Sequence, residues 1–328
     1  MSGPVTAKRI LVLGGHGFAG RHLLDAFAGS AHAVVPRSRR DGLDLRDFDT
    51  TRRALAEHAP DVVVHCAAVV GSLNYVTERA AEVVDENLRM LTNLYRAAAE
   101  VAPRAVIVNP VANCAYPGDL EVYREEDMWR GAIHPSVLSY GSTRRMMLVV
   151  AECYALQHRL RSVSTFVPNM YGPYDSTDPN KAHALNALVG KFVTASAEGH
   201  DVEVWGSGRP IREWLYAGDF GRVVRELVER MDGEAFDRPF NIGQNRGISI
   251  RQVVELLVAE LGFGGRIVWD QSRPDGAPKK VMDDRRFREH FPHFTFTDSH
   301  EGVRRTAAYY RSLLPTGLPT GSPTDLPT

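Results

Sequence analysis

The feature that most constrains this chain is a regular alternation of short apolar runs with helical patterns over its first two thirds. The apolar runs occupy residues 9–13, 33–35, 61–68, 105–112 and 163–168. Amphipathic helical patterns lie between them, at 18–29, 47–58, 78–101 and 140–159. Short apolar strands separated by helices are typical of βαβ units, whose parallel strands are buried on both faces. The sequence therefore predicts an α/β fold with a doubly wound parallel sheet.

The rhythm changes after Pro168, where the long polar stretch NMYGPYDSTDPNKAH begins. Beyond it, the apolar segments VEVW, FNIG and RIVWD alternate with helical patterns at 183–198, from 218, and at 249–261. We expect residues 1–168 to form mainly the sheet domain. Residues 169–314 should form mainly a smaller mixed lobe that is interleaved with the sheet and closes over a substrate. Residues 315–328 repeat Pro-Thr and cannot bury a core, so we expect a disordered tail.

The composition excludes several classes of protein. The 328 residues are 44% hydrophobic and 24% charged, which is ordinary for a globular protein, and the net charge of −1 gives no field that favours nucleic acid or an anionic membrane. No apolar run approaches the ~20 residues of a membrane span, and the N-terminus lacks the layout of a signal peptide. Three widely spaced cysteines without a CxxC motif fit a reducing compartment. We therefore expect a cytoplasmic protein without nucleic-acid or membrane partners and without a metal site.

A glycine-rich turn in ILVLGGHGFAGRHLL joins the first apolar run to the first helical pattern through Gly14, Gly17 and Gly20. Glycines at this spacing let the backbone approach a ligand closely, and the helix N-terminus that follows favours an anion. The pyrophosphate of a dinucleotide meets both conditions when the turn follows the first strand of an α/β chain. A plain tight turn is the alternative, but it does not account for three glycines at fixed spacing.

Three arginines, Arg37, Arg39 and Arg40, follow the second apolar run in VVPRSRRDGLDL. A site specific for NAD normally has an acidic residue here, which binds the ribose 2′-hydroxyl. Guanidinium groups suit a 2′-phosphate instead, so the sequence favours NADP(H) over NAD. Asp44, in the LDL that follows, is placed to reach the adenine. A solvated basic turn is the alternative interpretation.

The order of the motifs resembles the extended short-chain dehydrogenase/reductases: GxxGxxG, CAAVVGS, NCAYP, a helix that opens with Tyr, and NMYGP. Downstream, the segments NKAHALNALVGKF, VWGSGRPIREWLY, FNIGQNRGISIRQ and VWDQSRPDGAPKKVMD are similar to the GDP-L-fucose synthase family, bifunctional 3,5-epimerase/4-reductases of GDP-4-keto-6-deoxymannose. The resemblance covers about residues 8–312. It implies a Rossmann-type NADP-binding domain, with Ala67 in the cofactor site, followed by a lobe that binds a nucleotide sugar.

In that family a Cys and a His exchange protons at the carbons flanking the C4 ketone, and a Ser–Tyr–Lys group assists hydride transfer from NADPH. The resemblance matches the Cys to Cys114, the His to His183 and the Tyr to Tyr140. The position of the Ser holds Ala112, and that of the Lys holds Arg144. Taken singly, the Cys and the His are more often structural; together, in matching motifs, we interpret them as functional, because both types suit proton transfer near neutral pH.

The two departures predict an altered reductase. Ala112 cannot donate a hydrogen bond to the ketone oxygen, and losing such a donor typically costs about 10²–10³ in rate. Arg144 keeps a charge that lowers the pKa of Tyr140, and both residues would contact the nicotinamide ribose, but the broader guanidinium changes the geometry. Nearby side chains that would replace the missing donor are Asn113, Ser139, Ser142 and Thr143.

Substrate recognition looks better preserved in the resemblance. The matched positions that face the substrate are Asn113, Asn169, Trp205, Arg212, Asp275 and Lys280. Cations suit a pyrophosphate, a carboxylate accepts from a guanine edge, and Trp offers a flat apolar wall. A GDP-linked sugar is therefore favoured, with dTDP as the other possibility. The alternative for WGSGRPIREW is a surface turn around a buried Trp.

The resemblance also implies a homodimer, because related enzymes pair the helices that match 78–101 and 140–159 between subunits. The alternative is that both faces of these helices are covered within one chain.

Three functions remain open at this point. The first is a nucleotide-sugar epimerase acting at the 3- and/or 5-position of an NDP-4-keto-6-deoxyhexose, with the reductase step weakened or lost. The second is an NADPH-dependent 4-ketoreductase for a related sugar of the kind built for antibiotics, in which Arg144 and a substitute donor suffice. The third is a non-catalytic protein that binds NADP or a nucleotide sugar. Ala112 motivates this third function, whereas the retained Cys114 and His183 argue against it.

Overall fold

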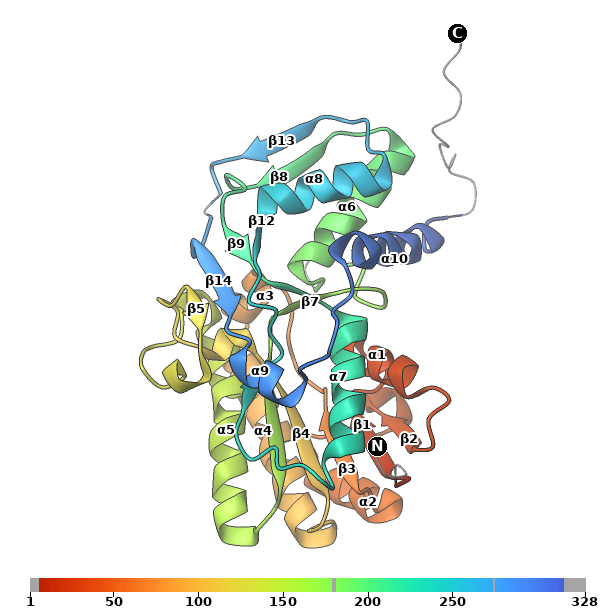
Figure 1. Cartoon of the computed structure of the whole chain (residues 1–328), viewed down its shortest axis with the longest axis vertical. Helices are drawn as coiled ribbons and strands as arrows, with labels where there is room; N and C mark the ends of the chain where they lie inside the picture. The colour runs from red at the N-terminus through yellow and green to blue at the C-terminus, as the bar shows by residue number, and fades with distance from the viewer. Residues whose placement is uncertain (1–5, 179–180, 274, 316–328) are drawn as a thin grey trace.

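A computed structural model describes residues 6–178, 181–273 and 275–315, so the predicted tail lies outside the described residues from 316 onward. Figure 1 shows a sheet with its helices in the lower part of the molecule and a smaller mixed lobe above it. The sheet has six strands in the order β11-β6-β4-β3-β1-β2, and all of its pairs are parallel. Its strands are β1 Arg9–Leu13, β2 Ala33–Arg37, β3 Val62–His65, β4 Val106–Ala112, β6 Ser162–Val167 and β11 Phe240–Asn241.

Two hydrophobic cores cover the two faces of this sheet, because successive side chains of a strand point to opposite faces. Leu11 and Leu13 enter one core, and Ile10 and Val12 enter the other. The helices on the first face are α2 Phe48–His58, α4 Ala80–Val101 and α5 Leu138–His158. The helices on the second face are α1 Phe18–Phe27, α7 Ala217–Arg230 and α9 Arg285–His290. Helices on both faces confirm the predicted doubly wound α/β fold.

The upper lobe has its own core, which lies between helices and short strands (Figure 1). Its helices are α6 Ala184–Glu198, α8 Ile250–Leu261 and α10 Ser299–Ser312. Its strands form the pairs β8 Val202–Trp205 with β13 Ile267–Asp270, and β7 Asn169–Tyr171 with β10 Trp214–Tyr216. A four-stranded sheet in the order β12-β9-β14-β5 comprises Ile248–Ser249, Ile211–Arg212, Lys279–Met282 and Val122–Tyr123.

The two parts exchange strands. β11 comes from the predicted FNIG segment, yet it pairs with β6 at the edge of the main sheet. Conversely, β5 comes from the first half of the chain but pairs with β14 of the lobe. The division of the chain at residue 168 stays a prediction, and these exchanges fit the interleaving that we expected.

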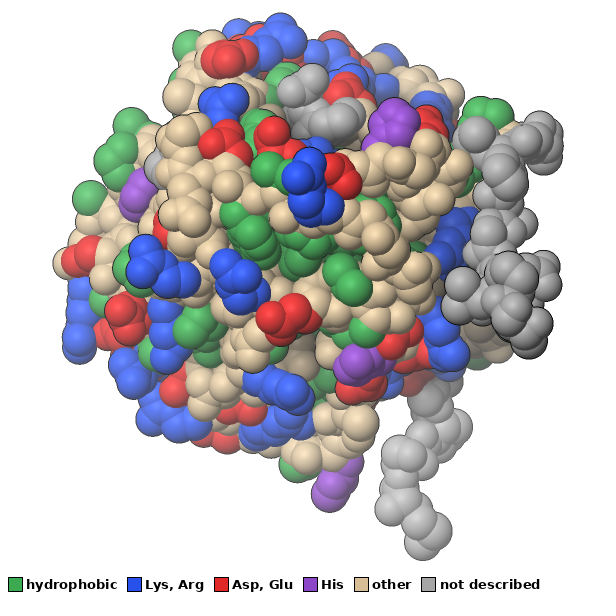
Figure 2. All heavy atoms as spheres, turned by 90° about the horizontal axis from the view of Figure 1, so that it is seen from above, with side chains coloured by type: hydrophobic (Ala, Val, Ile, Leu, Met, Phe, Trp, Pro, Cys, Tyr) green, Lys and Arg blue, Asp and Glu red, His purple; other side chains and the backbone are tan. Residues whose placement is uncertain are grey.

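The remaining described elements connect these layers. They are the helix α3 Leu73–Glu78 and four 3₁₀ turns, η1 Arg39–Asp41, η2 Asn113–Ala115, η3 Glu125–Asp127 and η4 Pro135–Val137. Figure 2 looks down on the lobe end of the molecule, where apolar side chains gather near the middle of the face and Lys and Arg side chains lie around them. Within the described ranges, no helix combines the length and the apolarity needed to cross a membrane.

Candidate active site

A cleft of about 270 Å³ lies where β1 and β3 end. From β1 the chain moves to β2 on one side, while β3 lies on the other side, so the cleft is at the switch point where open α/β sheets bind ligands. Most of the predicted cofactor residues line it: Gly14, Gly17, Arg37, Asp44 and Ala67. The structure thus brings the glycine turn, the basic turn and the segment after β3 together around one cleft.

Backbone atoms form the floor of this cleft. Gly14 has φ +76°, and a Cβ atom there would lie 2.7 Å from the backbone nitrogen of Ala67. Its N–H donates to the carbonyl of Arg37 at 2.8 Å, which joins the turn to β2. Gly20 lies beneath the turn, where a Cβ would be 2.4 Å from the carbonyl oxygen of Gly14. Gly20 therefore packs the helix against the turn, and the N-terminus of α1 faces the cleft as a dinucleotide pyrophosphate requires.

The three predicted arginines all line the cleft, but they differ in what they bind. Arg37 donates from Nε to Nε2 of His58 at 3.0 Å. Among the described residues, the guanidinium groups of Arg39 and Arg40 have no hydrogen bond or ion pair. These two groups are therefore the ones available to a 2′-phosphate.

Asp44 also lies in the cleft, and its carboxylate is bound by a neighbour. Arg46 donates from Nε to Oδ1 at 2.9 Å and from Nη2 to Oδ2 at 2.6 Å. This pairing lowers the pKa of Asp44, so the carboxylate stays ionised. Each carboxylate oxygen thus already accepts two hydrogen bonds from Arg46, and the contact with adenine stays a prediction.

The predicted thiol and phenol lie together just beyond the end of β4. Cys114 is in η2, and α5 presents Tyr140 and Arg144 one turn apart. Between them Gly141 allows close packing, because a Cβ there would lie 2.5 Å from the carbonyl oxygen of Cys114. The guanidinium carbon of Arg144 is 4.9 Å from the centre of the Tyr140 ring. The sequence motif SYGSTR thus forms a compact cluster with the Cys loop.

Burial dominates the acid–base properties of this cluster. It raises the pKa of the Cys114 thiol to about 11, although the nearby charges of Arg144 and Lys280 act to lower it. Burial likewise raises the pKa of Tyr140, and this outweighs the lowering by Arg144. The expected effect of the cation on the phenol is present, but the net direction is opposite because desolvation disfavours the charged form. Both groups are therefore protonated at neutral pH.

Arg144 is buried and is held from α4. Its Nη2 donates to Oδ1 of Asn87 at 2.8 Å, and Nδ2 of Asn87 donates to the carbonyl of Val69 at 2.9 Å. Within the described part of the chain, Nε of Arg144 and both ring nitrogens of His65 have no hydrogen-bond partner. Burial, with the charge of Arg144 nearby, lowers the pKa of His65 to about 3, so this ring is neutral.

Two of the four candidate replacements for the missing Ser hydroxyl are already used. Ser139 donates to the carbonyl of Val76 at 2.6 Å, and Thr143 donates to the carbonyl of Tyr140 at 2.7 Å. Ser142 is two residues from Tyr140 and so lies on another side of α5. Asn113 remains: it is half-buried, adjacent to Cys114, and its side chain has no hydrogen bond to any described residue.

His183 lies at the start of α6 and has a separate set of contacts. Its Nδ1 is 3.1 Å from Oδ2 of Asp175, and its ring centroid is 5.1 Å from that of Phe18, the first residue of α1. Among described residues, no hydrogen bond or ring contact joins His183 to Cys114. Both nevertheless lie at the same edge of the main sheet, because Phe18 follows β1 and Cys114 follows the parallel strand β4.

Most of the predicted substrate residues lie in the lobe, whereas Asn113 follows β4 of the main sheet. Arg212 and Lys280 are register partners on β9 and β14, and burial lowers the pKa of both. Asp275 accepts from the backbone nitrogen and from Oγ of Ser207, both at 2.6 Å, so it holds the turn after β8. Trp205, which ends β8, is 55% exposed. This turn-holding bond explains Asp275 structurally, and its contact with a guanine stays a prediction.

Asn169 opens β7 and pairs in register with Trp214 of β10. It directly follows the main-sheet strand β6, one residue after Pro168. The segment that carries Asn169 therefore leads from the sheet edge into the loop before His183.

Residues 10–243 match the family model described as the NAD dependent epimerase/dehydratase family. The chain belongs to this family. It is 29% identical over 280 residues to a GDP-L-fucose synthase of Azorhizobium caulinodans, which covers 84% of this chain and 88% of the relative. It is 27% identical over 305 residues to a GDP-L-colitose synthase of Yersinia pseudotuberculosis, which covers 92% of this chain and 97% of the relative. A GDP-L-fucose synthetase of Naegleria fowleri, crystallised with NADP, has a TM-score of 0.83 at 25% identity over 94% of this chain and 95% of that chain.

These comparisons confirm that the chain is an extended short-chain dehydrogenase/reductase that resembles GDP-L-fucose synthase, and that it is an enzyme of this superfamily. The predicted α/β class is confirmed as well. The roles of the individual site residues stay predictions.

Several residues of this epimerase/dehydratase site escaped the sequence analysis. They are Phe18, His65, Asn87, Asp175 and Asn186. A signal existed for one of them, since Asp175 lies in the same polar stretch as His183 and an acid close to a functional His is a common arrangement. The others lie inside helices or strands, where nothing in the local pattern separates them from ordinary core positions.

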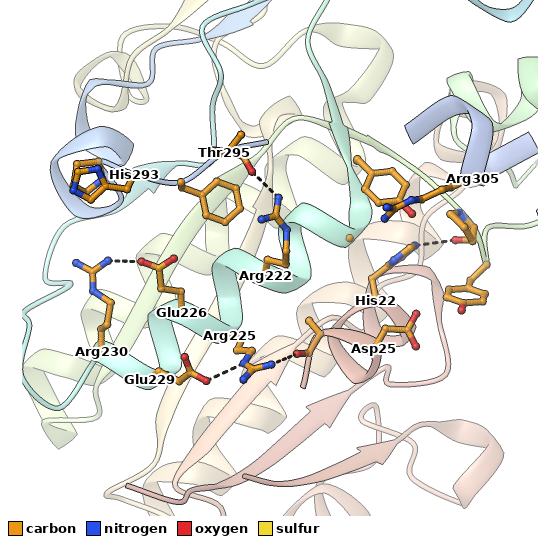
Figure 3. A pocket seen from close by; sticks show the side chains of 17 residues that line it. His22, Asp25, Arg222, Arg225, Glu226, Glu229, Arg230, His293, Thr295 and Arg305 are labelled. Carbon is orange, nitrogen blue, oxygen red and sulfur yellow. Dashed lines mark hydrogen bonds and ion pairs between the residues drawn. The ribbon is translucent and has the colours of Figure 1, made fainter. Parts of the chain in front are cut away.

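A cavity of about 1060 Å³ lies elsewhere, and none of the predicted site residues line it. It lies between α1 and α7, and Figure 3 shows its charged side chains bound to one another. Arg225 pairs with Glu229, and Arg230 pairs with Glu226. Because these cations already have partners, this cavity offers no clear anion site.

Proposed function

We propose that this chain is a nucleotide-sugar epimerase that acts at the 3- and/or 5-position of an NDP-4-keto-6-deoxyhexose, with its 4-reductase step weakened or lost. The observation that carries the proposal is the cluster of Cys114, Tyr140 and Arg144 beside the cofactor cleft, next to an Ala112 that has no hydroxyl. GDP is favoured over dTDP as the nucleotide, and the names of the Azorhizobium and Yersinia relatives support this choice.

NADP(H) is the proposed cofactor, with NAD less favoured. The backbone floor at Gly14 fits a pyrophosphate, and the guanidinium groups of Arg39 and Arg40 fit a 2′-phosphate. Tyr140 and Arg144 would hold the nicotinamide ribose. The NADP in the Naegleria relative supports this assignment. When bound, NADPH supplies the hydride for a C4 ketone.

This chain retains both residues that the family resemblance assigns to proton exchange, Cys114 and His183. The C4 ketone acidifies the hydrogens on C3 and C5, and inversion needs one group that removes a proton and another that returns it. His183 has Nδ1 directed at Asp175, so it would exchange protons through Nε2. Cys114 would act as the second group, and the charges of Arg144 and Lys280 favour the thiolate that it must pass through.

The substrate would be held from the lobe. Arg212 and Lys280 present two adjacent cations to a diphosphate, and the exposed Trp205 offers its face to the base. Lys280 is also close enough to Cys114 to act on the pKa of the thiol. The same side chain would thus link diphosphate binding to the proton-exchange group.

A 4-ketoreductase is the second candidate, and one observation favours it. Tyr140 is protonated and next to the charge of Arg144, so it can give its proton to a C4 oxygen as a hydride arrives. Asn113 would then supply the hydrogen bond that Ala112 cannot give.

Deuterium labelling separates these functions. The protein is incubated with GDP-4-keto-6-deoxymannose in deuterium oxide, with and without NADPH. Deuterium at C3 or C5 without NADPH oxidation is the expected result, and Cys114→Ala or His183→Ala should lower its rate by about 10²–10⁴. NADPH consumption that Tyr140→Phe abolishes supports the reductase instead. If GDP- and dTDP-linked 4-keto sugars give neither deuterium incorporation nor NADPH consumption, the chain is a binding protein and the proposal is refuted.

A homodimer formed through α4 and α5 is also proposed. These helices lie side by side on one face of the sheet, and α5 exposes apolar side chains, with Met146 38% and Leu156 77% exposed (Figure 1). Burial of such side chains against a second copy would stabilise the pair. Sedimentation equilibrium should give twice the chain mass, and Leu156→Glu should give a monomer; a monomeric unmodified chain would refute this assembly.

A further inference from the structure

Asp175 contacts the predicted catalytic residue His183 and also a buried asparagine. Its Oδ2 lies 3.1 Å from Nδ1 of His183 and accepts from the backbone nitrogen of the same residue at 2.8 Å. It also accepts from Nδ2 of Asn186 at 2.7 Å. The carboxylate side chain is only 5% exposed, whereas the ring of His183 is 38% exposed. The imidazole therefore has one nitrogen against a buried carboxylate and one neighbour, Phe18, near its ring, while part of the ring stays exposed.

The backbone before Asp175 is strained in a way that directs this side chain. Tyr174 has φ +73°, in the left-handed region that non-glycine residues rarely adopt. Its ring packs outward, 4.8 Å beneath the guanidinium of Arg21 and 5.2 Å from the ring of His22. The next residue, Asp175, is buried and contacts His183. Strain of this kind costs about 1–3 kcal/mol and is typically retained where geometry matters for function.

A second buried residue fixes the carboxylate from the other side. Asn186 is fully buried in α6, and its Oδ1 accepts from the backbone nitrogen of Gly172 at 3.0 Å. Its amide orientation is thereby set, because the donor end must then point to Asp175. Asp175 is thus held by a strained turn on one side and by an oriented amide on the other.

We propose that Asp175 is a positioning residue that holds the imidazole of His183 with a hydrogen on Nδ1, so that Nε2 is the atom that exchanges protons with the substrate. This inference rests on the proposed epimerase function. A carboxylate that accepts from one ring nitrogen fixes the tautomer and the ring orientation.

The proton balance of this arrangement is simple. In the resting ring, Nδ1 carries hydrogen, which it donates to Asp175, and Nε2 has a lone pair. When Nε2 takes a proton from a carbon beside the ketone, the electron pair of the C–H bond passes into the enolate and the ring becomes an imidazolium. The carboxylate of Asp175 compensates that charge. For inversion, the thiol of Cys114 gives its proton to the opposite face of that carbon as the enolate collapses, and the sulfur becomes a thiolate. Proton exchange with solvent then returns the imidazolium to its neutral form and the thiolate to the thiol, and the Nδ1 hydrogen never leaves.

A purely structural role is the competing explanation, because Asp175 also accepts from the backbone at the start of α6. Asp175→Asn distinguishes the two, since the amide oxygen can still accept from that backbone nitrogen while the charge is lost. Asp298→Asn is the matched control: Asp298 caps α10 by accepting from the backbone nitrogen of His300 at 2.9 Å. Thermal unfolding of each variant shows whether the fold is retained.

The first measurement needs no substrate. ¹⁵N spectra of the protein labelled at histidine, with the His183 signals assigned from His183→Gln, report which ring nitrogen carries hydrogen. We expect the Nδ1–H form in the unmodified chain, in Asp298→Asn and in Asp175→Asn, because the amide oxygen that replaces Oδ2 can still accept from Nδ1. We expect a mixture or the Nε2–H form in Asp175→Ala, which has no acceptor. An Nε2–H ring in the unmodified chain, or an unchanged tautomer in a folded Asp175→Ala, would overturn the proposal.

The second measurement is the deuterium exchange rate. Asp175→Asn should lower it by about 10², within the range of a general acid–base group, while Asp298→Asn leaves it unchanged. Asn186→Ala, which keeps the carboxylate but frees its orientation, should lower it about tenfold. Full activity in a folded Asp175→Asn would also overturn the proposal. If the unmodified chain exchanges no deuterium, the proposed function fails, and the tautomer measurement still decides the contact.

Discussion

Two buried asparagines, Asn186 and Asn87, hold charged residues on the two sides of the catalytic chemistry, and they do so to different degrees. Asn186 donates to Asp175 at 2.7 Å and accepts from the backbone of Gly172 at 3.0 Å. Asn87 accepts from Arg144 at 2.8 Å and also bonds both backbone groups of Val69. Each asparagine thus ties a charged side chain to a loop at the edge of the sheet.

The difference lies in what surrounds the charged residue. Oδ2 of Asp175 accepts from the backbone nitrogen of His183 and from Nδ2 of Asn186, and it lies 3.1 Å from Nδ1 of His183. Arg144, in contrast, has a buried Nε without a partner among the described residues, and so do both nitrogens of the nearby His65. Ala112 adds a missing hydroxyl on the same side. The residue that we propose for proton exchange, His183, thus has a buried carboxylate partner within the chain. Nε of Arg144 is instead left for the nicotinamide ribose that we propose it contacts, and Ala112 is the one departure on that side for which no contact among the described residues compensates.

The largest expected effect comes from restoring the missing hydroxyl. Ala112→Ser places a hydroxyl at the end of β4, where a donor to the ketone oxygen is expected to act. Because such donors contribute about 10²–10³ in rate, NADPH oxidation should rise by up to about 10². Stopped-flow fluorescence of NADPH with GDP-4-keto-6-deoxymannose measures this rate.

Asn113→Ala is the control for that experiment, because Asn113 is the available substitute donor. If Asn113 already fills the role, its removal lowers the rate and Ala112→Ser restores it. An unchanged rate of NADPH oxidation in Ala112→Ser would show that Arg144, and not the missing hydroxyl, limits hydride transfer. The difference between the hydride-transfer and proton-exchange residues would then not depend on the hydroxyl.

A second effect concerns the protonation of Cys114. With a pKa of about 11, only about 10⁻³ of the thiol is ionised at pH 8, and the thiolate is the reactive form. The rate of alkylation by iodoacetamide should therefore rise about tenfold per pH unit from pH 7 to pH 10. An ordinary thiol, with a pKa near 8.5, levels off by about pH 9.5. Mass spectrometry of the Cys114 peptide gives the rate, with the exposed Cys153 as reference.

Lys280→Met sharpens this measurement. Lys280 acts to lower the pKa of Cys114, so its removal should slow alkylation of Cys114 further and leave Cys153 unchanged. A plateau of the alkylation rate below pH 9 in the unmodified chain would show that the pKa of the Cys114 thiol is not raised. The thiol would then be activated in the resting site, contrary to the effect of its burial.

Much of the fold could be predicted, because it depends on local periodicity. The predicted helix 140–159 is observed at Leu138–His158, and 249–261 at Ile250–Leu261. The run 61–68 was predicted too long: β3 ends at His65, since the next residues leave the sheet to line the cofactor cleft. Two-residue strands such as β9 escaped prediction, because they exist only through pairing with distant segments.

The sequence predicted the parts of the site that short motifs mark. It did not predict the properties that depend on burial or on contacts between segments far apart in the chain. The resemblance assigned Cys114 and Tyr140 to one site, and the structure brings their two segments together where Gly141 packs against the carbonyl oxygen of Cys114. The direction of the pKa shift of Tyr140 was wrong, because a sequence shows the neighbouring cation but not the burial that outweighs it. The contact of Arg144 with Asn87, 57 residues away, has no local signature at all.

The smallest effect tests the two asparagines directly. Asn87→Ala removes the acceptor for Arg144 and leaves both backbone groups of Val69 unpaired, so it should cost about 1–3 kcal/mol in the free energy of unfolding. Thermal unfolding measures this loss. Because Asn87 is not connected to His183, deuterium exchange at the sugar should be retained in Asn87→Ala, whereas Asn186→Ala should impair it. Equal loss of deuterium exchange in both variants would mean that the residues around Arg144 and those around His183 act as one unit, and that the two asparagines do not have separate roles.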